Sequence, residues 1–141
     1  MAISARNVFE GTVTALTPGA VNAELVIGTA GGVGIVATVT MQSVETLGLE
    51  LGRKAVAIVK SPSVIVVAGT PGYRFSARNQ LAGTVAAISA GAVNSEVGID
   101  VGGVLVQAVI TNHAIAELGL SIGAPATAIF KAGSVIVGVA V

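Results

Sequence analysis

Side chains that donate hydrogen bonds recur in the same order along this chain. Ser4, Arg6 and Asn7 are followed further on by Thr40 and Lys60. Arginine presents a planar fork of N–H groups and lysine a compact ammonium, while a hydroxyl can turn toward any acceptor. Thr40 also directly precedes a predicted helix, whose first N–H groups favour an anion. Together these groups suit a small, fully deprotonated oxyanion. The same set returns as Ser76, Arg78, Asn79, Thr111 and Lys131.

The donors recur because the chain is a tandem repeat. Three blocks return 72 positions later, namely Ser4–Asn7, Gly11–Val13 and Gly19–Asn22. Lys60 returns as Lys131, one position earlier than that spacing requires, so one residue has been deleted near Gly102 and Gly103 in the second copy. Roughly half of the aligned positions are identical, which indicates a duplicated domain. We predict one domain at 1–68 and another at 73–141, joined by a linker at 69–72.

The same residues offer little for catalysis. The one histidine, His113, aligns with Gln42 of the first copy, so we interpret it as incidental. Glu24 and Glu96 do recur, but each stands alone along its strand, which favours an ion pair or an interface hydrogen bond. The sequence has no Gly-x-Ser-x-Gly elbow, no phosphate-binding P-loop and no cluster of metal-ligating residues. We therefore expect a binding protein rather than an enzyme, with no catalytic cofactor and no bare metal cation.

The elements that must position the donors are mostly strands. Segments rich in Val, Ile, Thr and Ala, separated by Gly, Pro or Asn, lie at 8–16, 22–27, 34–40, 55–61 and 64–68. One short helix is predicted at 41–47 and its counterpart at 112–118, each ended by a glycine. Five strands with a helix between the third and fourth follow the order of an OB-type barrel. We predict an all-β protein of two tandem OB-fold domains, each a five-stranded Greek-key barrel with one short helix.

Composition narrows the class of partner. The 141 residues are 53% hydrophobic and only 10% charged, with zero net charge. Domains this small bury little surface on their own and often assemble, so we expect an oligomer. A nucleic-acid partner is disfavoured, because such binding depends on a surplus of Lys and Arg. The aromatic residues are also scattered, whereas OB-folds that bind single strands stack bases on aromatic side chains.

Composition and the N-terminus also bear on location. The apolar runs are strand-length and bounded by Ser, Gly or Pro, so no membrane-spanning helix and no membrane partner is expected. The first residues run directly into the repeated motif, which leaves no room for a signal peptide. The chain also has no cysteine and hence no disulfide framework. We expect a cytoplasmic protein.

These residues resemble a known family. The ordered series Ser-Ala-Arg-Asn, Gly-Thr-Val, Gly-Ala-Val-Asn, the threonine before the helix, Leu-Gly-Leu and the final lysine is similar to the molybdate-binding Mop domain. Two such domains in tandem, covering essentially the whole chain, resemble the di-domain molbindins. The resemblance implies a homotrimer of di-domain chains with molybdate or tungstate bound between subunits. It also implies a role in intracellular storage or homeostasis of the oxyanion.

The resemblance further implies two kinds of molybdate site. The first kind takes residues from neighbouring domains: Ser4, Ala5, Arg6, Asn7, Thr40, Lys60 and Ser61, and in the second copy Ser76, Ala77, Arg78, Asn79, Thr111, Lys131 and Ala132. The second kind lies near the three-fold axis, where two turns supply backbone N–H groups: Gly19, Ala20, Val21 and Asn22, and Gly91, Ala92, Val93 and Asn94. Because Ala132 and Ala114 replace Ser61 and Ser43, we hypothesise that the two domains hold the oxyanion with unequal affinity.

The donor chemistry accounts for part of the selectivity. A site made only of donors disfavours phosphate, which near neutral pH usually carries a proton that needs an acceptor. The choice of molybdate over sulfate rests on the resemblance alone. Three alternatives stay open: an oxyanion-sensing accessory subunit of a molybdate transport or regulatory system, an OB-fold binder of single-stranded nucleic acid, and a structural oligomer without ligand. The last leaves the repeated Arg and Lys unexplained.

Overall fold

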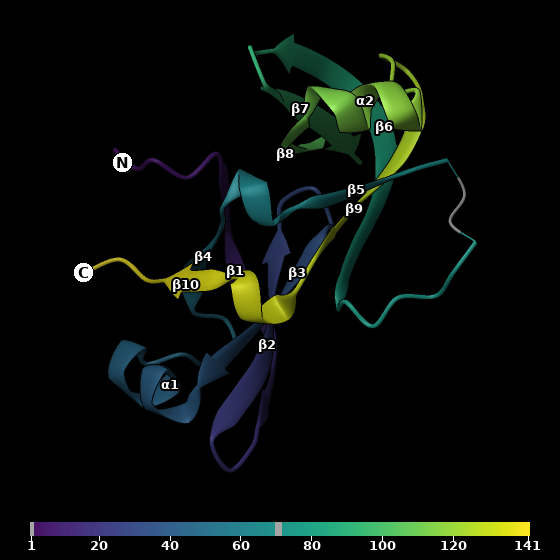
Figure 1. The fold of residues 1–141 in the computed structure, drawn as a ribbon. Coiled ribbons are helices and arrows are strands. Elements are labelled where there is room, and N and C mark those ends of the chain that lie inside the picture. Colours follow the sequence, from purple (N-terminus) through teal and green to yellow (C-terminus); the bar gives the residue numbers. More distant parts are fainter. Residues whose placement is uncertain (1, 70–71) are drawn as a thin grey trace. The chain divides into compact units, whose positions relative to one another are not determined.

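The computed structural model describes residues 2–69 and 72–141, and most of this chain is β-strand (Figure 1). The chain forms two compact units. Unit 1 consists of the residues up to Val59 together with Lys131–Val141, and unit 2 consists of Lys60–Phe130. Of the predicted linker at 69–72, residues 70 and 71 lie outside the described residues.

Unit 1 is built on one antiparallel sheet with the strand order β10-β4-β1-β2-β3. The strands are β1 (Asn7–Pro18), β2 (Asn22–Thr29), β3 (Gly34–Thr40), β4 (Lys54–Val59) and β10 (Ile136–Gly138). A short helix, α1 (Met41–Leu47), connects β3 to β4, and a 3-10 turn, η2 (Ala132–Ser134), precedes β10.

Unit 2 repeats this arrangement with the strand order β5-β9-β6-β7-β8. The strands are β5 (Ile65–Ala68), β6 (Asn79–Ala90), β7 (Asn94–Val101), β8 (Val104–Thr111) and β9 (Pro125–Phe130). The helix α2 (Asn112–Leu118) connects β8 to β9, and the 3-10 turn η1 (Ser61–Ser63) precedes β5.

The fifth strand of each sheet comes from the other sequence repeat. In unit 1, Ile136 of β10 pairs with Ile58 of β4, and Figure 1 shows the yellow β10 beside β4. In unit 2, Ile65 of β5 pairs with Ile129 of β9. β5 and β10 can exchange sheets because both carry the sequence Val-Ile-Val and can therefore pair with the same edge of either sheet. The predicted domain bounds, 1–68 and 73–141, follow the sequence repeat and stay a prediction, whereas the sheets are assembled across it.

Each sheet curls so that its two edge strands approach. β10 contacts β3 in unit 1, and β5 contacts β8 in unit 2, which gives the closed strand order of an OB barrel. Alternate residues of the strands fill the interior, as Leu25 and Ile27 do in unit 1 and Val97 and Ile99 do in unit 2. The predicted all-β class with two OB-like units is thereby confirmed.

The predicted helices have the limits expected from sequence. Thr40 and Thr111 are their N-caps, and Gly48 and Gly119 end them in the left-handed conformation, at φ 63° and 61°. The strand predicted at 55–61 ends earlier, at Val59, and Ser61 begins η1 instead. The reason is local, because Pro62 has no N–H to continue a β ladder and its ring favours a turn.

Candidate functional site

The predicted arginine and lysine of each copy flank the last bridge of one strand ladder. In unit 1, Asn7 pairs with Val59. Arg6 directly precedes this bridge along the chain, and Lys60, the first residue of unit 2, directly follows it. Both cations are exposed, whereas Asn7 is 1% exposed. The register therefore shows that Arg6 and Lys60 each adjoin one residue of the same bridge, of which Asn7 is the buried one.

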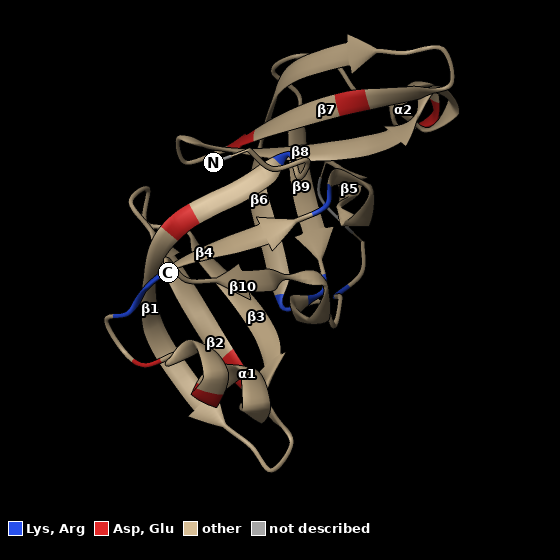
Figure 2. Cartoon of the chain, turned by 90° about the vertical axis from the view of Figure 1, so that its left-hand side faces the viewer, with Lys and Arg blue, Asp and Glu red and all other residues tan. Residues whose placement is uncertain are grey.

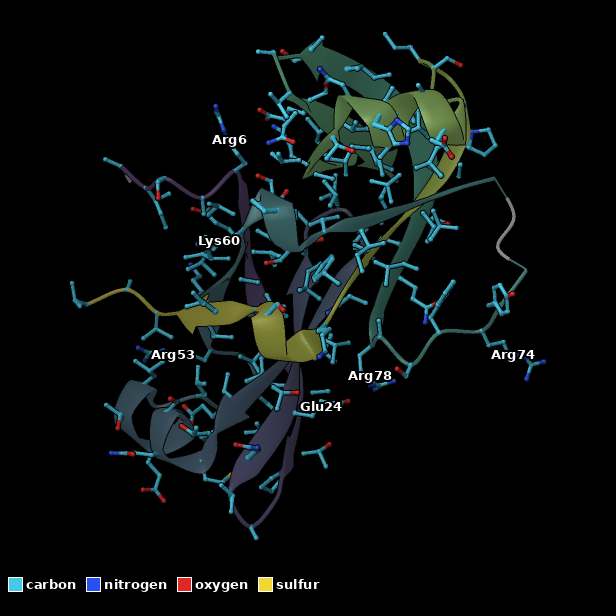
Figure 3. All side chains as sticks on the ribbon, viewed as in Figure 1. Arg6, Glu24, Arg53, Lys60, Arg74 and Arg78 are labelled. Atoms are coloured by element: carbon cyan, nitrogen blue, oxygen red, sulfur yellow. The ribbon has the colours of Figure 1, made fainter. Side chains whose placement is uncertain are left out.

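Unit 2 has the same ladder end. Asn79, also 1% exposed, pairs with Phe130. Along the chain, Arg78 precedes this bridge and Lys131, the residue at which the chain returns to unit 1, follows it; both are exposed. Figure 3 shows the Arg6 and Arg78 side chains extending beyond the ends of β1 and β6. The arrangement of the two cations is therefore duplicated, as the sequence repeat predicts.

The residue after each lysine turns inward. Ser61 and Ala132 are each 6% exposed and begin the 3-10 turns η1 and η2, which pack against β8 and β3 respectively. The backbone bonds of the two turns match, with Ser63 N–H donating to the Lys60 carbonyl at 2.9 Å and its counterpart in η2 at 3.0 Å. Replacing Ser61 by Ala132 thus changes a buried side chain and leaves the turn unaltered.

The predicted threonines serve as helix caps. Thr40 Oγ1 accepts a hydrogen bond from Ser43 N–H at 3.1 Å, and Thr111 Oγ1 accepts one from Ala114 N–H at 3.0 Å. Thr40 also donates its hydroxyl proton to Ser43 Oγ at 2.9 Å. Because Ala114 offers no such acceptor, the Thr111 hydroxyl keeps a donor for another partner.

One unit does not bring its own arginine and threonine together. Arg6 directly precedes β1, whereas Thr40 pairs with Asn22, which follows the turn at the far end of β1. Because β1 has 12 residues, about 35 Å of extended chain separates the two. The same register separates Arg78 from Thr111 in unit 2. Each threonine lies instead beside the turn of its own unit.

The two predicted turns are exposed and built alike. Val21 and Val93, at matching positions, are each 71% exposed. The carbonyl oxygen of Asn22 lies 2.5 Å from where a Cβ on Gly19 would stand, and that of Asn94 lies 2.4 Å from the equivalent point on Gly91. Only glycine fits these two positions.

Three contact residues were missed by the sequence reasoning. Gln80 Nε2 donates to the Phe75 and Ala77 carbonyls, both at 2.9 Å, and so holds the backbone beside Arg78. Ser95 and Asn112 form a contact beneath the turn of unit 2. A signal was available, because each is a polar residue at a position where the first copy has Val8, Ala23 or Met41.

Charge and polarity elsewhere offer no competing site chemistry. Figure 2 shows a ribbon that is mostly uncharged, with Lys, Arg, Asp and Glu widely spaced. Among residues 2–69 and 72–141 no group of three His, Asp or Glu could hold a metal ion. His113 is an exposed side chain whose Nε2 lies 3.4 Å from Glu117 Oε1, a kind of surface pair that contributes little.

A cleft of about 760 Å³ in unit 1 lies away from the predicted residues. Its lining is mostly small or apolar, with Gly11, Gly28 and Val139 among the lining residues and Glu10 and Lys54 as the charged ones. Since it holds a carboxylate and contains none of the recurring donors, the cleft does not match the chemistry of an oxyanion site.

The two helices of the described chain have seven residues each. In the part of the chain that the structure describes, no helix has the length and apolar character needed to cross a membrane.

One family model matches the chain twice. The TOBE domain model matches residues 3–66 and again residues 76–137. The chain therefore belongs to the TOBE-domain family, in a form with two tandem domains.

Individual relatives make the kinship more specific. The molybdenum transport protein ModE of Herbaspirillum seropedicae is 42% identical over 99% of this chain, and the molybdenum-pterin-binding protein MopA of Rhodobacter capsulatus is 42% identical over 96%. The chain spans 52% of the length of both curated relatives. A crystal structure of the cytoplasmic molybdate-binding protein ModG, with molybdate bound, is 51% identical and has a TM-score of 0.94. That match covers 99% of this chain and 100% of ModG. The predicted relation to the di-domain molbindins is confirmed.

Proposed function

We propose that this protein binds molybdate or tungstate inside the cell, for storage or homeostasis of the oxyanion, and that it is not an enzyme. The observation that carries the proposal is the exposed arginine–lysine pair at one ladder end of each unit. The proposal is supported by ModG, whose structure holds molybdate and aligns over nearly the whole chain at 51% identity. We also propose a cytoplasmic location, which is supported by the description of ModG as cytoplasmic.

The donor set fits a tetrahedral dianion. An arginine fork and a lysine ammonium can together neutralise two negative charges while donating several hydrogen bonds. Exposed Ser4 and Ser76, two positions before each arginine, add hydroxyl donors. The two proposed segments are completed by Ala5 and Asn7 and by Ala77 and Asn79, which contribute backbone groups or anchor the segment. The buried Ser61 and Ala132 contribute to this site through the position of the preceding lysine.

The first kind of site is proposed to lie between subunits. If a site takes both an arginine and a threonine, the threonine must come from elsewhere, because about 35 Å of strand separates Arg6 from Thr40 within unit 1. Exposed apolar residues at repeat-matched positions support assembly: Val21 and Val93, Leu51 and Ile122, and Ile65 and Ile136. Large apolar side chains exposed at the same place in both copies mark a surface that is covered. We propose that the assembly is a homotrimer.

The second kind of site is proposed at the turns. An anion near the three-fold axis would meet the backbone N–H groups of two turns: Gly19, Ala20, Val21 and Asn22 in unit 1, and Gly91, Ala92, Val93 and Asn94 in unit 2. Of these, the Gly91 N–H already donates to the Asn94 carbonyl at 3.0 Å. The support is the exposure of both turns and the close approach that demands glycine at their first position. Consecutive backbone N–H groups in such a turn form an anion-binding concavity.

The test is calorimetric titration of the anion-stripped protein with molybdate, then with sulfate and phosphate. We expect tight molybdate binding at more than two anions per chain, with little displacement by sulfate. Arg6→Ala and Arg78→Ala should each weaken binding at the affected sites by about 10- to 100-fold, because each removes charge-assisted hydrogen bonds. Arg74→Ala is the charge-matched control, since Arg74 is exposed and does not recur. The absence of heat and of thermal stabilisation with any oxyanion would refute the proposal.

The trimer has its own test. Sedimentation equilibrium should give three times the 13.7 kDa mass of one chain. A monomer that still binds molybdate at the arginine–lysine pair would contradict the inter-subunit site while leaving the binding function intact.

A second candidate function is suggested by the longer relatives. Because the chain spans 52% of a ModE protein, the second candidate is an oxyanion-sensing portion of a molybdate transport or regulatory system. An immunoblot of a cell extract separates the two functions. A single species of 13.7 kDa favours a free-standing binder, whereas a band of about twice that mass favours the sensing portion.

A further inference from the structure

A polar side-chain contact lies beneath the turn of unit 2. The Ser95 hydroxyl donates to Asn112 Oδ1, and Asn112 Nδ2 donates to the Gly91 carbonyl at 2.9 Å. Ser95 is 3% exposed, whereas Gly91 and the rest of its turn are exposed. Asn112 therefore connects a buried anchor to the first residue of the Gly91–Asn94 turn.

Asn112 holds the turn at two carbonyl groups. Its side-chain Nδ2 donates to the Gly91 carbonyl, and its backbone N–H donates to the Val93 carbonyl at 2.9 Å. In a planar trans peptide the carbonyl and the following N–H point in opposite directions. Fixing the Gly91 carbonyl toward Asn112 therefore fixes the Ala92 N–H away from it, on the exposed side of the turn.

Unit 1 provides a natural comparison that lacks the side-chain contact; unit 2 also has a bond from Gly91 N–H to the Asn94 carbonyl at 3.0 Å within its turn. Met41 N–H donates to the Val21 carbonyl at 2.8 Å, which matches the backbone bond of unit 2. However, Met41 stands in place of Asn112, and Ala23 in place of Ser95. The Met41 side chain has no N–H to donate, so it cannot hold the Gly19 carbonyl. The orientation of the Ala20 N–H is therefore not fixed by such a contact.

We propose that Asn112, oriented by Ser95, is a positioning residue that preorganises the Gly91–Asn94 turn for an anion. The turn sites of the two units are consequently unequal, and the Gly91–Asn94 turn binds molybdate more tightly than the Gly19–Asn22 turn. The inference rests on the proposed function and goes beyond it, by naming the residues that set the difference. Ordering a turn before binding removes part of the entropic cost of binding, so we expect a difference of about three- to tenfold in affinity.

The test exchanges the contact between the two units. The double variant S95A/N112M gives unit 2 the residues of unit 1, and A23S/M41N gives unit 1 the residues of unit 2. Both are made in an Arg6→Ala, Arg78→Ala background, so that molybdate titration reports on the turn sites. His113→Gln is the matched control, because it also exchanges a residue of α2 for its counterpart in the first copy and its side chain is exposed.

We expect two classes of turn site in the background protein, differing by about three- to tenfold. S95A/N112M should lower the molybdate affinity of the tighter turn site to that of the weaker one, and A23S/M41N should raise the affinity of the weaker turn site. Amide exchange without ligand gives an independent measurement: residues 91–94 should exchange more slowly than residues 19–22, and the two double variants should remove that difference from opposite sides. If S95A/N112M folds poorly, A23S/M41N still tests the proposal by a gain of affinity and protection.

Each way in which this experiment can fail leads to a different conclusion. Unchanged turn affinities and unchanged exchange in both double variants would overturn the positioning role, with molybdate binding intact. A lower melting temperature of S95A/N112M without a change in turn affinity would also overturn it, since that is the result of a purely structural contact. If the unmodified protein binds no molybdate, the proposed function fails and the affinity difference fails with it, while the exchange data still show whether Asn112 orders the turn.

Discussion

Units 1 and 2 share their ladders and differ in the side chains that hold their exposed segments. Both have an asparagine at the last bridge, a threonine cap and an exposed turn. In unit 2, Gln80 holds the backbone before β6 and Asn112 holds the turn after it. In unit 1, apolar residues occupy both positions, and Thr40 gives its proton to Ser43 instead. Duplication thus preserved the groups that we propose bind a ligand, while the residues that hold the neighbouring backbone diverged.

Divergence of this kind bears on affinity more than on specificity. The recurring arginines and lysines, which we propose set the charge of each site, are the same in both copies. The contacts of Gln80 and Asn112 order the backbone before a ligand binds. They reduce the conformational entropy lost on binding, which changes the affinity without changing which ligand is preferred. The hypothesis of unequal domains therefore gains a physical basis in unit 2, at residues other than the Ser61 and Ser43 replacements that suggested it.

The largest expected difference between the units concerns the core residue at the ladder end. Phe130 and Val59 occupy matching positions and are 1% and 0% exposed. Phe130→Ala should cost about 4 kcal/mol and Val59→Ala about 2 kcal/mol, because the larger side chain leaves the larger cavity. Urea unfolding followed by circular dichroism, with amide exchange to resolve the two units, measures both. Equal losses would mean that the two cores tolerate cavities differently from what their side-chain volumes predict.

The next effect should be nearly equal in the two units. A Cβ on Gly11 would stand 2.1 Å from the Gly28 carbonyl oxygen, and one on Gly83 would stand 2.0 Å from that of Asp100. Gly11→Ala and Gly83→Ala should each cost about 3 kcal/mol, since backbone of the adjacent strand must move. Gly133→Ala is the control, because no atom lies within 4 Å of its Cβ position. Thermal unfolding of the three variants checks this, and a tolerated Gly83→Ala would contradict the close packing of β6 on β7.

The helix caps should show a smaller and equal effect. Thr40→Ala and Thr111→Ala each remove one N-cap hydrogen bond, of 3.1 Å and 3.0 Å, and should each cost about 1 kcal/mol. Thr40→Ala also removes the bond to Ser43 Oγ, which adds little because it is exposed and competes with water. Chemical denaturation of the two variants tests the equality. A clearly larger loss for Thr111→Ala in the absence of anion would show that its hydroxyl has a structural role beyond the cap.

The smallest effect should come from Gln80. Gln80→Val places the residue of the first copy at an exposed position and removes two bonds of 2.9 Å to backbone carbonyls. We expect a loss of about 0.5 to 1 kcal/mol, because exposed hydrogen bonds compete with water. Amide exchange at residues 75–78 should become faster, while residues 3–6 are unaffected. Unchanged exchange at 75–78 would show that Gln80 does not order this segment.

Much of the architecture was predictable because it is encoded locally. The Thr-to-Gly spacing marked both helices, and their limits are confirmed at Met41–Leu47 and Asn112–Leu118. Strand positions followed from runs of β-branched residues between turn residues. The strand predicted to include Ser61 was wrong at its end, since Pro62 makes a 3-10 turn there. The grouping of arginine with lysine in one site stays a prediction, although both directly adjoin the same ladder bridge.

The sequence by itself determined the duplication, the all-β class, the helices and the recurring donors, because each depends on residue type and spacing along the chain. The tertiary structure alone decided which sheet each fifth strand joins. Since β5 and β10 have the same local pattern, either sheet offers each of them an equivalent edge, and no local signal chooses between the two. It also decided that Asn112 reaches Ser95 and Gly91, residues 17 and 21 positions away. Such contacts follow from strand register, which brings together residues that spacing in the sequence keeps apart.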